Sequence, residues 1–260
     1  MGHNRLPRLP ATRPWQEVVA LLQAEPVAQE VISAAAHAAR HSFTYAVEDA
    51  VYAEAVRLLV VIARAARSDN FTVELRRNGI LVDQAPDLIS FLDATGRRLD
   101  TVLSASSEPS DFGALARRAV LGSLYSELGR EMPSLFAEGA EVLELAARKF
   151  SSPRGFSELA RAFYTRMTAE TLTYWLDRTL GAQIGTARAF NNIEDRTDFD
   201  AAVQQFSSEA TRIIKEFSEG WYAKNALRDG FDPSAAPRAY AATAFKKIND
   251  ELRRKVGSDA

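Results

Sequence analysis

Apolar residues recur at intervals of three and four along most of the chain, which is the spacing of one face of an α-helix. The pattern is clearest in three stretches, Phe156 to Leu180, Val203 to Trp221 and Ala241 to Val256. Because short loops join them, we expect an antiparallel three-helix unit over about residues 154–256. Its expected core residues are Phe163, Trp175, Phe206, Ile213, Phe217, Phe245 and Leu252. The sequence therefore predicts an all-α fold, a multi-helix bundle.

Residues 71–82 admit two interpretations. Apolar residues alternate with polar ones from Phe71 to Leu75, and Asn78-Gly79 is a frequent hairpin turn. The competing interpretation is a short helix that ends at Asn78, with Gly79 as the left-handed residue after it. We favour the helix, because an isolated two-stranded hairpin is only marginally stable in water.

Segments rich in proline or serine interrupt the apolar pattern, and their positions predict how the chain is organised. Residues 1–13 hold three arginines and two prolines without an apolar run, which indicates a flexible basic arm. Residues 104–111 are rich in serine and contain a proline, so they are the expected linker. It separates an N-terminal helical region, 14–103, from a C-terminal helical bundle, 112–260. Ser110 is the expected N-cap of the helix that follows the linker.

Composition excludes several classes of function. The 260 residues include no cysteine, which rules out disulfides, thiolate metal sites and cysteine nucleophiles. The formal net charge is -2, spread evenly, which is not the footprint of a nucleic-acid-binding chain. Since neither a secretory signal nor a long apolar stretch is visible, we expect a cytoplasmic protein. The 26 arginines against 6 lysines suggest a GC-rich bacterial genome.

Motifs for nucleotide binding and for serine catalysis are absent from the sequence. His37 and His41 share one helical face, with Glu30 and Glu48 one heptad before and after them. Two histidines and a carboxylate are a possible divalent metal set, and a metal-dependent hydrolase is the hypothesis they allow. Arg40 beside the pair disfavours a cation, so a polar helix face is preferred, and we expect no catalytic residue, no metal and no cofactor.

Two groups of residues are candidate contact sites. Tyrosine and arginine are frequent interface anchors, and four of them lie near the polar side of the helix expected from about 155, namely Tyr164, Arg166, Tyr174 and Arg178. The second group is the basic tail, where phosphate contact is possible through Lys246, Lys247, Arg253, Arg254 and Lys255. Cations near a helix C-terminus are also favoured by the helix dipole alone.

Amphipathic helices without a catalytic constellation favour a protein that works by binding. We therefore expect a non-enzymatic helical interaction subunit, an accessory or adaptor of a bacterial multi-protein system such as phage defence. Its expected partners are proteins of the same operon or further copies of the chain, and no membrane. The alternatives are a nucleic-acid-associated protein, using the basic arm and tail, and the hydrolase built on His37 and His41.

Overall fold

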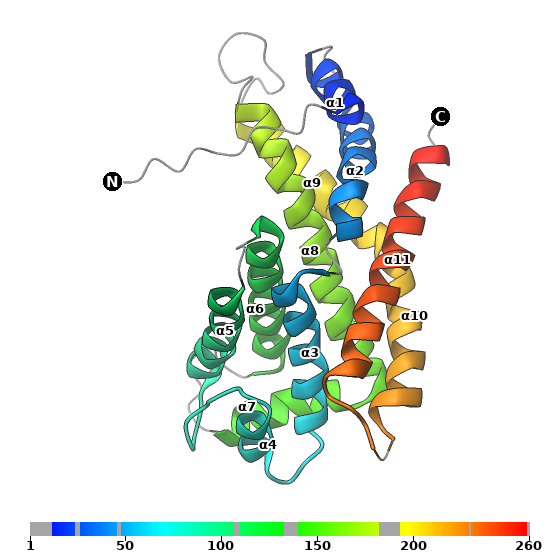
Figure 1. Cartoon of the computed structure of the whole chain (residues 1–260). Coiled ribbons are helices and arrows are strands. Elements are labelled where there is room, and N and C mark those ends of the chain that lie inside the picture. Colours follow the sequence, from blue (N-terminus) through cyan, green and yellow to red (C-terminus); the bar gives the residue numbers. More distant parts are fainter. Residues whose placement is uncertain are drawn as a thin grey trace.

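The computed structural model describes residues 12–23, 27–45, 48–106, 110–132, 140–181, 193–228 and 230–258. Within these ranges the chain is helical and contains no strand, as the all-α prediction requires (Figure 1). The α-helices are α1 (Arg13–Gln23), α2 (Ala28–Tyr45), α3 (Ala50–Ala65), α4 (Phe71–Arg77), α5 (Leu88–Ala105), α6 (Asp111–Glu131), α7 (Ala140–Arg148), α8 (Pro153–Gly181), α9 (Ile193–Ala210), α10 (Arg212–Trp221) and α11 (Ala235–Ser258). A 3-10 turn (η2, Lys149–Ser151) precedes α8, and a π-helical turn (η3, Tyr222–Ala226) follows α10. No helix in the described ranges is long and apolar enough to cross a membrane.

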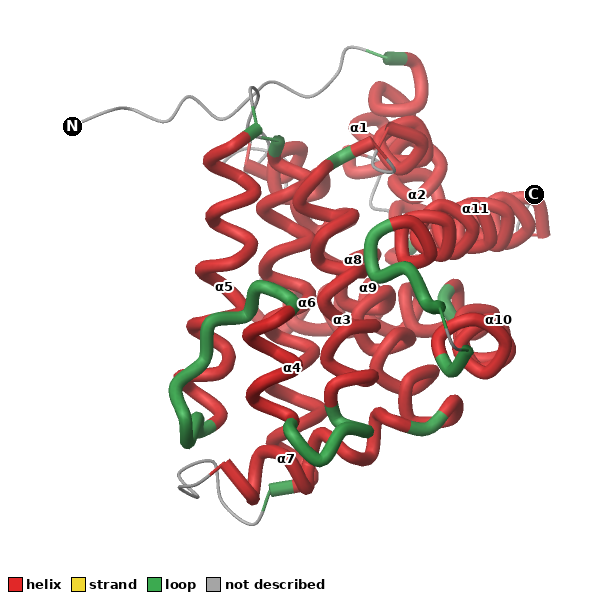
Figure 2. Tube along the Cα trace, turned by 60° about the horizontal axis from the view of Figure 1, so that its bottom comes forward, coloured by secondary structure: helices red, strands yellow, loops and turns green. Residues whose placement is uncertain are grey.

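Helix α8 lies at the centre of the molecule and packs against α2, α3, α6, α9 and α10. In Figure 1, α3, α5 and α6 lie on one side of α8, and α10 and α11 lie on the other. Figure 2 shows α3, α5 and α6 side by side. Adjacent residues of α8, such as Phe163 and Tyr164, are both fully buried, because neighbouring helices cover this helix on several faces.

Residues 71–82 form the helix α4 and its cap, so the hairpin alternative is wrong. The Gly79 N–H bonds to the Arg76 carbonyl at 3.0 Å, and the Ile80 N–H bonds to the Leu75 carbonyl at 3.0 Å. This pair of bonds is a Schellman cap, and it requires the left-handed φ of +88° that Gly79 adopts. The buried Ile80 then holds the chain against the core beyond the helix end.

Ser110 caps α6 as the sequence predicts, since its Oγ accepts the Gly113 N–H at 2.8 Å. The expected linker, 104–111, contains the last residues of α5 and the first of α6, and its residues 107–109 lie outside the described part. One hydrophobic core cluster includes residues from both sides of it. Its role as a boundary between two regions stays a prediction, and most of the basic arm, 1–13, also lies outside the described residues.

The expected three-helix unit corresponds to α8, α9 with α10, and α11, but its second helix is divided. Thr211 separates α9 from α10, and its Oγ1 donates to the Ser207 carbonyl at 2.8 Å. Such back-bonding by threonine competes with the helical pattern and bends helices. Of the seven expected core residues, four are buried, and three are partly buried at the edge of the core, namely Trp175, Ile213 and Phe217.

A chain of buried hydroxyls joins α3, α8 and α11. The Tyr52 hydroxyl donates to the Ala241 carbonyl at 3.0 Å and lies 3.1 Å from the Tyr164 hydroxyl. Since Tyr52 uses its proton on Ala241, Tyr164 donates to Tyr52. The prediction that Tyr164 lies on the polar side of its helix is therefore wrong, because this bond satisfies its hydroxyl inside the core.

Glu54 of α3 pairs with Arg57 of the same helix and with Arg98 of α5, which links the two helices. Its carboxylate accepts hydrogen bonds from Arg57 Nε at 2.7 Å and from Arg98 Nε at 2.6 Å. Burial of Glu54 disfavours its charged form, but the hydrogen bonds and charges of the two arginines outweigh burial and lower its pKa. The ionised carboxylate is thus part of the packing between the two helices.

Candidate functional site

A polar hollow lies along α8, between α6 on one side and α9 with α10 on the other. We call it the α6–α8 groove, and its volume is about 610 Å³. Among the described residues that line it, Ala162 alone has an apolar side chain, while five are basic and three are acidic. Pockets for small molecules are mostly apolar, so this lining is more typical of a surface that receives a charged partner.

Arg166 packs closely against α6 at position 122, where the residue is a glycine. A Cβ at Gly122 would stand 2.9 Å from the Nε and Cζ atoms of Arg166, closer than side chains tolerate. The Arg166 Nη2 donates to the Ser126 Oγ at 3.2 Å, one helical turn further along α6. Glycine inside a helix costs about 0.5–1 kcal/mol relative to alanine. In α6 this glycine makes room for the guanidinium that α8 places in the groove.

The break between α9 and α10 positions the other wall. Arg161 Nη2 donates to the Ser208 carbonyl at 3.3 Å and to the Ser208 Oγ at 3.2 Å. Ser208 lies in the last turn of α9, where carbonyls without helical partners attract cations. Thr165 lies one turn after Arg161 on α8, and its Oγ1 is 2.7 Å from the Oγ1 of Thr211. The division of the second helix thus creates the polar contacts that join α8 to this wall.

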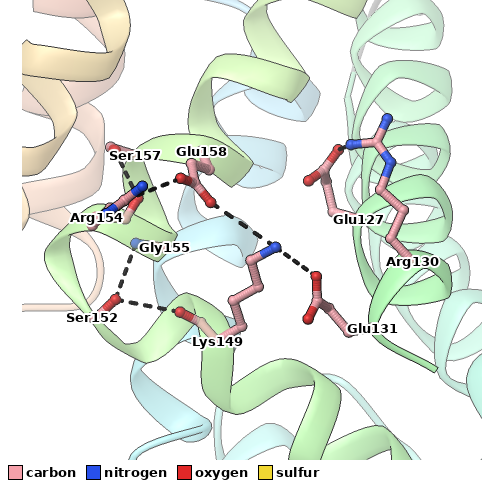
Figure 3. Close-up of polar contacts among 9 residues, drawn as sticks. All are labelled: Glu127, Arg130, Glu131, Lys149, Ser152, Arg154, Gly155, Ser157 and Glu158. Atoms are coloured by element: carbon pink, nitrogen blue, oxygen red, sulfur yellow. Dashed lines mark hydrogen bonds and ion pairs between the residues drawn. The ribbon is translucent and has the colours of Figure 1, made fainter.

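At one end of the groove, Lys149 lies between two glutamates from different helices (Figure 3). Its Nζ is 2.5 Å from the Glu131 carboxylate of α6 and 4.0 Å from the Glu158 carboxylate of α8. Arg130 and Glu127 form a further ion pair, 2.5 Å long, on α6. The charges at this end are therefore compensated within the chain.

Further along α8, Glu170 is half-buried and lies 3.0 Å from the Arg118 Nε. Burial raises the pKa of Glu170, against the opposing charges of Arg118 and Arg166. One of its carboxylate oxygens makes no hydrogen bond of good geometry, and the buried Ser123 Oγ makes none at all.

The positive charge of the groove is concentrated on Arg161, Arg166 and Lys215. Within the described part of the chain, none of the three forms an ion pair with a carboxylate. They come from α8 and α10, and Arg161 and Arg166 are only partly exposed. Since cations that lose water without a carboxylate partner are unfavourable, the groove is suited to an acidic ligand.

Apart from Tyr164, two of the predicted contact residues on α8, Arg166 and Tyr174, lie in or beside this groove. Tyr174 is partly buried, donates to an Asp111 carboxylate oxygen and packs edge-on against Trp175 with ring centroids 5.2 Å apart. It lines a neighbouring hollow of about 540 Å³ that shares Glu170 and Gln204 with the groove. The structure thus brings Arg166 and Tyr174 to adjacent hollows, while the side chain of Arg178 lies outside the described residues.

The basic tail is largely compensated by acids. Arg253 lies 3.8 Å from Asp250, Arg254 lies 3.2 Å from Glu251, and Lys255 lies 2.6 Å from Glu209 of α9. The two remaining lysines differ, since the Nζ of Lys247 lies 5.2 Å from the ring centroid of Phe217, whereas Lys246 is exposed. A phosphate backbone would compete with these acids for the same cations.

The histidine pair lies on α2, where His37, Glu30 and Glu48 near its ends are exposed and the side chain of His41 is outside the described part. Among the described residues, no group of three or more potential ligands could hold a metal ion.

Sequence reasoning found Arg166 but missed Arg161, Lys215 and Gly122. The signal for Gly122 was an isolated glycine inside a helical pattern, which often marks a close approach. No local pattern indicates which side chains α6, α8 and α10 bring together. No model of a known family, no curated protein and no solved structure matches the chain.

Proposed function

We propose that the chain is a non-enzymatic, cytoplasmic interaction subunit of a bacterial multi-protein system, and that its α6–α8 groove receives an acidic segment of a partner protein. The observation that carries this proposal is the set of three cations without carboxylate partners, Arg161, Arg166 and Lys215, along one groove. Two of them already have fixed positions, on Ser208 and Ser126, which lowers the entropic cost of binding.

The charge pattern favours a protein over a nucleic acid. Glu127, Glu158 and Glu170 line the same groove and would repel a phosphate backbone. A polypeptide segment can place acids against Arg161, Arg166 and Lys215 and basic or polar residues against the glutamates. The partner is either another protein of the same system or a second copy of this chain.

The test is co-purification of the full chain with its operon neighbours, comparing two triple variants of equal charge. The groove variant carries Arg161→Ala, Arg166→Ala and Lys215→Ala. The control variant removes three exposed cations outside the groove, at Arg97, Lys224 and Arg238. We expect the partner to stay with the control variant and to be lost from the groove variant. Equal recovery with both variants would show that the groove is not the binding site.

A further inference from the structure

A second hollow lies between the end of α3, helix α4 and the segment that follows the π-helical turn. Its volume is about 600 Å³, and it shares no lining residue with the α6–α8 groove. We call it the Arg64 pocket. The π-helical turn ends at Ala226, directly before the lining residues Leu227 and Arg228. Such turns are rare and occur frequently at functional sites.

Four arginines line the Arg64 pocket, namely Arg64, Arg67, Arg77 and Arg228. Among the described lining residues the only acid is Glu74, and it is already paired with Arg77 at 2.5 Å. Arg67 donates a long hydrogen bond of 3.4 Å to the Ser151 carbonyl. The pocket therefore carries a net charge of about +3 from its described lining, which favours an anion with more than one negative charge.

Arg64 is an arginine of this pocket whose guanidinium has no hydrogen-bond acceptor within the described chain. It is partly buried, and its Cζ lies 4.2 Å from the ring centroid of Phe231, so the ring covers one face of the guanidinium. Within the described chain no carboxylate, carbonyl or hydroxyl accepts a hydrogen bond from it. The donors of this partly buried guanidinium are not used within the described chain and are available to a ligand that supplies acceptors.

A second polar group close to these arginines also has no partner. Tyr222 is fully buried, and its hydroxyl makes no hydrogen bond. Burial raises the pKa of Tyr222 to about 12, although the positive charges of Arg67 and Arg64 act in the opposite direction. The Tyr222 hydroxyl is therefore close enough for the charges of both arginines to affect its pKa. It stays protonated and uncharged at neutral pH, so it does not neutralise them.

We propose that the Arg64 pocket binds a small organic phosphate. A guanidinium matches two phosphate oxygens with parallel hydrogen bonds, and several arginines around one hollow suit a dianion. The same pocket offers an apolar edge, made by Leu227, Phe231 and Pro233, for the organic part of the ligand. A volume of about 600 Å³ lies in the range of pockets for such molecules.

Titration calorimetry on the full chain, with phenyl phosphate, inorganic phosphate and benzoate as probes, tests the site. Because the pocket combines arginines with an apolar edge, phenyl phosphate should bind more tightly than inorganic phosphate. Benzoate, which carries one negative charge, should bind most weakly. Loss of a bidentate contact in Arg64→Ala should weaken phenyl phosphate binding at least about tenfold.

Arg228→Ala serves as the second variant, since Arg228 is exposed and its removal leaves the core intact. It should weaken phenyl phosphate binding as well, whereas Arg97→Ala on α5, outside the pocket, should leave it unchanged. The proposal is overturned if the wild-type chain binds neither phosphate at millimolar concentration, if benzoate binds as tightly as phenyl phosphate, or if both pocket variants bind like the wild type.

Discussion

Replacing Gly122 with alanine places a methyl group where the Arg166 side chain lies against α6. The new Cβ would stand 2.9 Å from the Nε and Cζ atoms and 3.0 Å from the Cδ atom of Arg166. Because these atoms belong to a flexible side chain, we expect Arg166 to leave its position while the backbone of α6 stays in place. Gly220→Ala is a matched control, since a Cβ at Gly220 of α10 meets no atom within 4 Å.

Both substitutions replace a helical glycine with alanine, but only Gly122→Ala also displaces Arg166. Alanine in place of glycine inside a helix stabilises by about 0.5–1 kcal/mol, and Gly220→Ala should show this gain in full. In Gly122→Ala the displaced Arg166 loses its hydrogen bond to Ser126, which is worth about 0.5–1.5 kcal/mol. The two effects oppose each other, so we expect the free energy of unfolding to change by less than about 1 kcal/mol.

Urea denaturation of a double-mutant cycle measures the difference. In an Arg166→Ala background the clash no longer exists, so Gly122→Ala should stabilise the chain as much as Gly220→Ala does. In the wild-type background it should stabilise less. Equal gains from the two glycine substitutions in the wild-type background would refute the contact between Arg166 and Gly122.

Three further predictions concern the core. Tyr52→Phe should destabilise the fold by about 2–3 kcal/mol and Tyr164→Phe by about 1 kcal/mol in urea denaturation, because only the first leaves a buried hydroxyl without an acceptor; equal losses would contradict the direction of the hydrogen bond. Phe217→Ala should cost about 1.5–3 kcal/mol, less than a fully buried ring, whereas the exposed Glu216→Ala should change stability by less than about 0.5 kcal/mol. Because the pKa of Glu54 is lowered in the fold, its contribution is present at neutral pH and is lost as the pH falls below about 4; Glu54→Gln should therefore be less stable than the wild type at pH 7, and an equal deficit at pH 3 would contradict this reasoning.

The sequence predicts features that depend on neighbouring residues. The Schellman cap at Gly79 and the N-cap at Ser110 each follow from a few consecutive residues, and the structure confirms both. The apolar stripes likewise predict the helices, because their spacing is local. The same reasoning places Phe217 on an apolar face, but it does not show that this face lies at the edge of the core.

Features that depend on distant residues were not predictable in this way. A tyrosine hydroxyl favours an exposed position when only the local sequence is considered. The hydroxyl of Tyr164 is instead buried, because it bonds to Tyr52, which lies 112 residues earlier in the chain. The division of the second helix at Thr211 depends on contacts with Thr165 of α8 as well as on its own back-bonding. The groove itself exists because α6 and α10 both pack against α8, and Lys215 of α10 lies far along the chain from Arg161 and Arg166 of α8.

We propose that the α6–α8 groove binds an acidic segment of a partner protein. The most direct test is the affinity of the purified chain for the recovered partner, measured by calorimetry at two salt concentrations. We expect the groove variant, with Arg161, Arg166 and Lys215 replaced by alanine, to bind at least about tenfold more weakly than the wild type. The wild-type affinity should also fall more steeply with salt than that of the variant. Equal affinities and equal salt dependence for the two proteins would contradict binding at this groove.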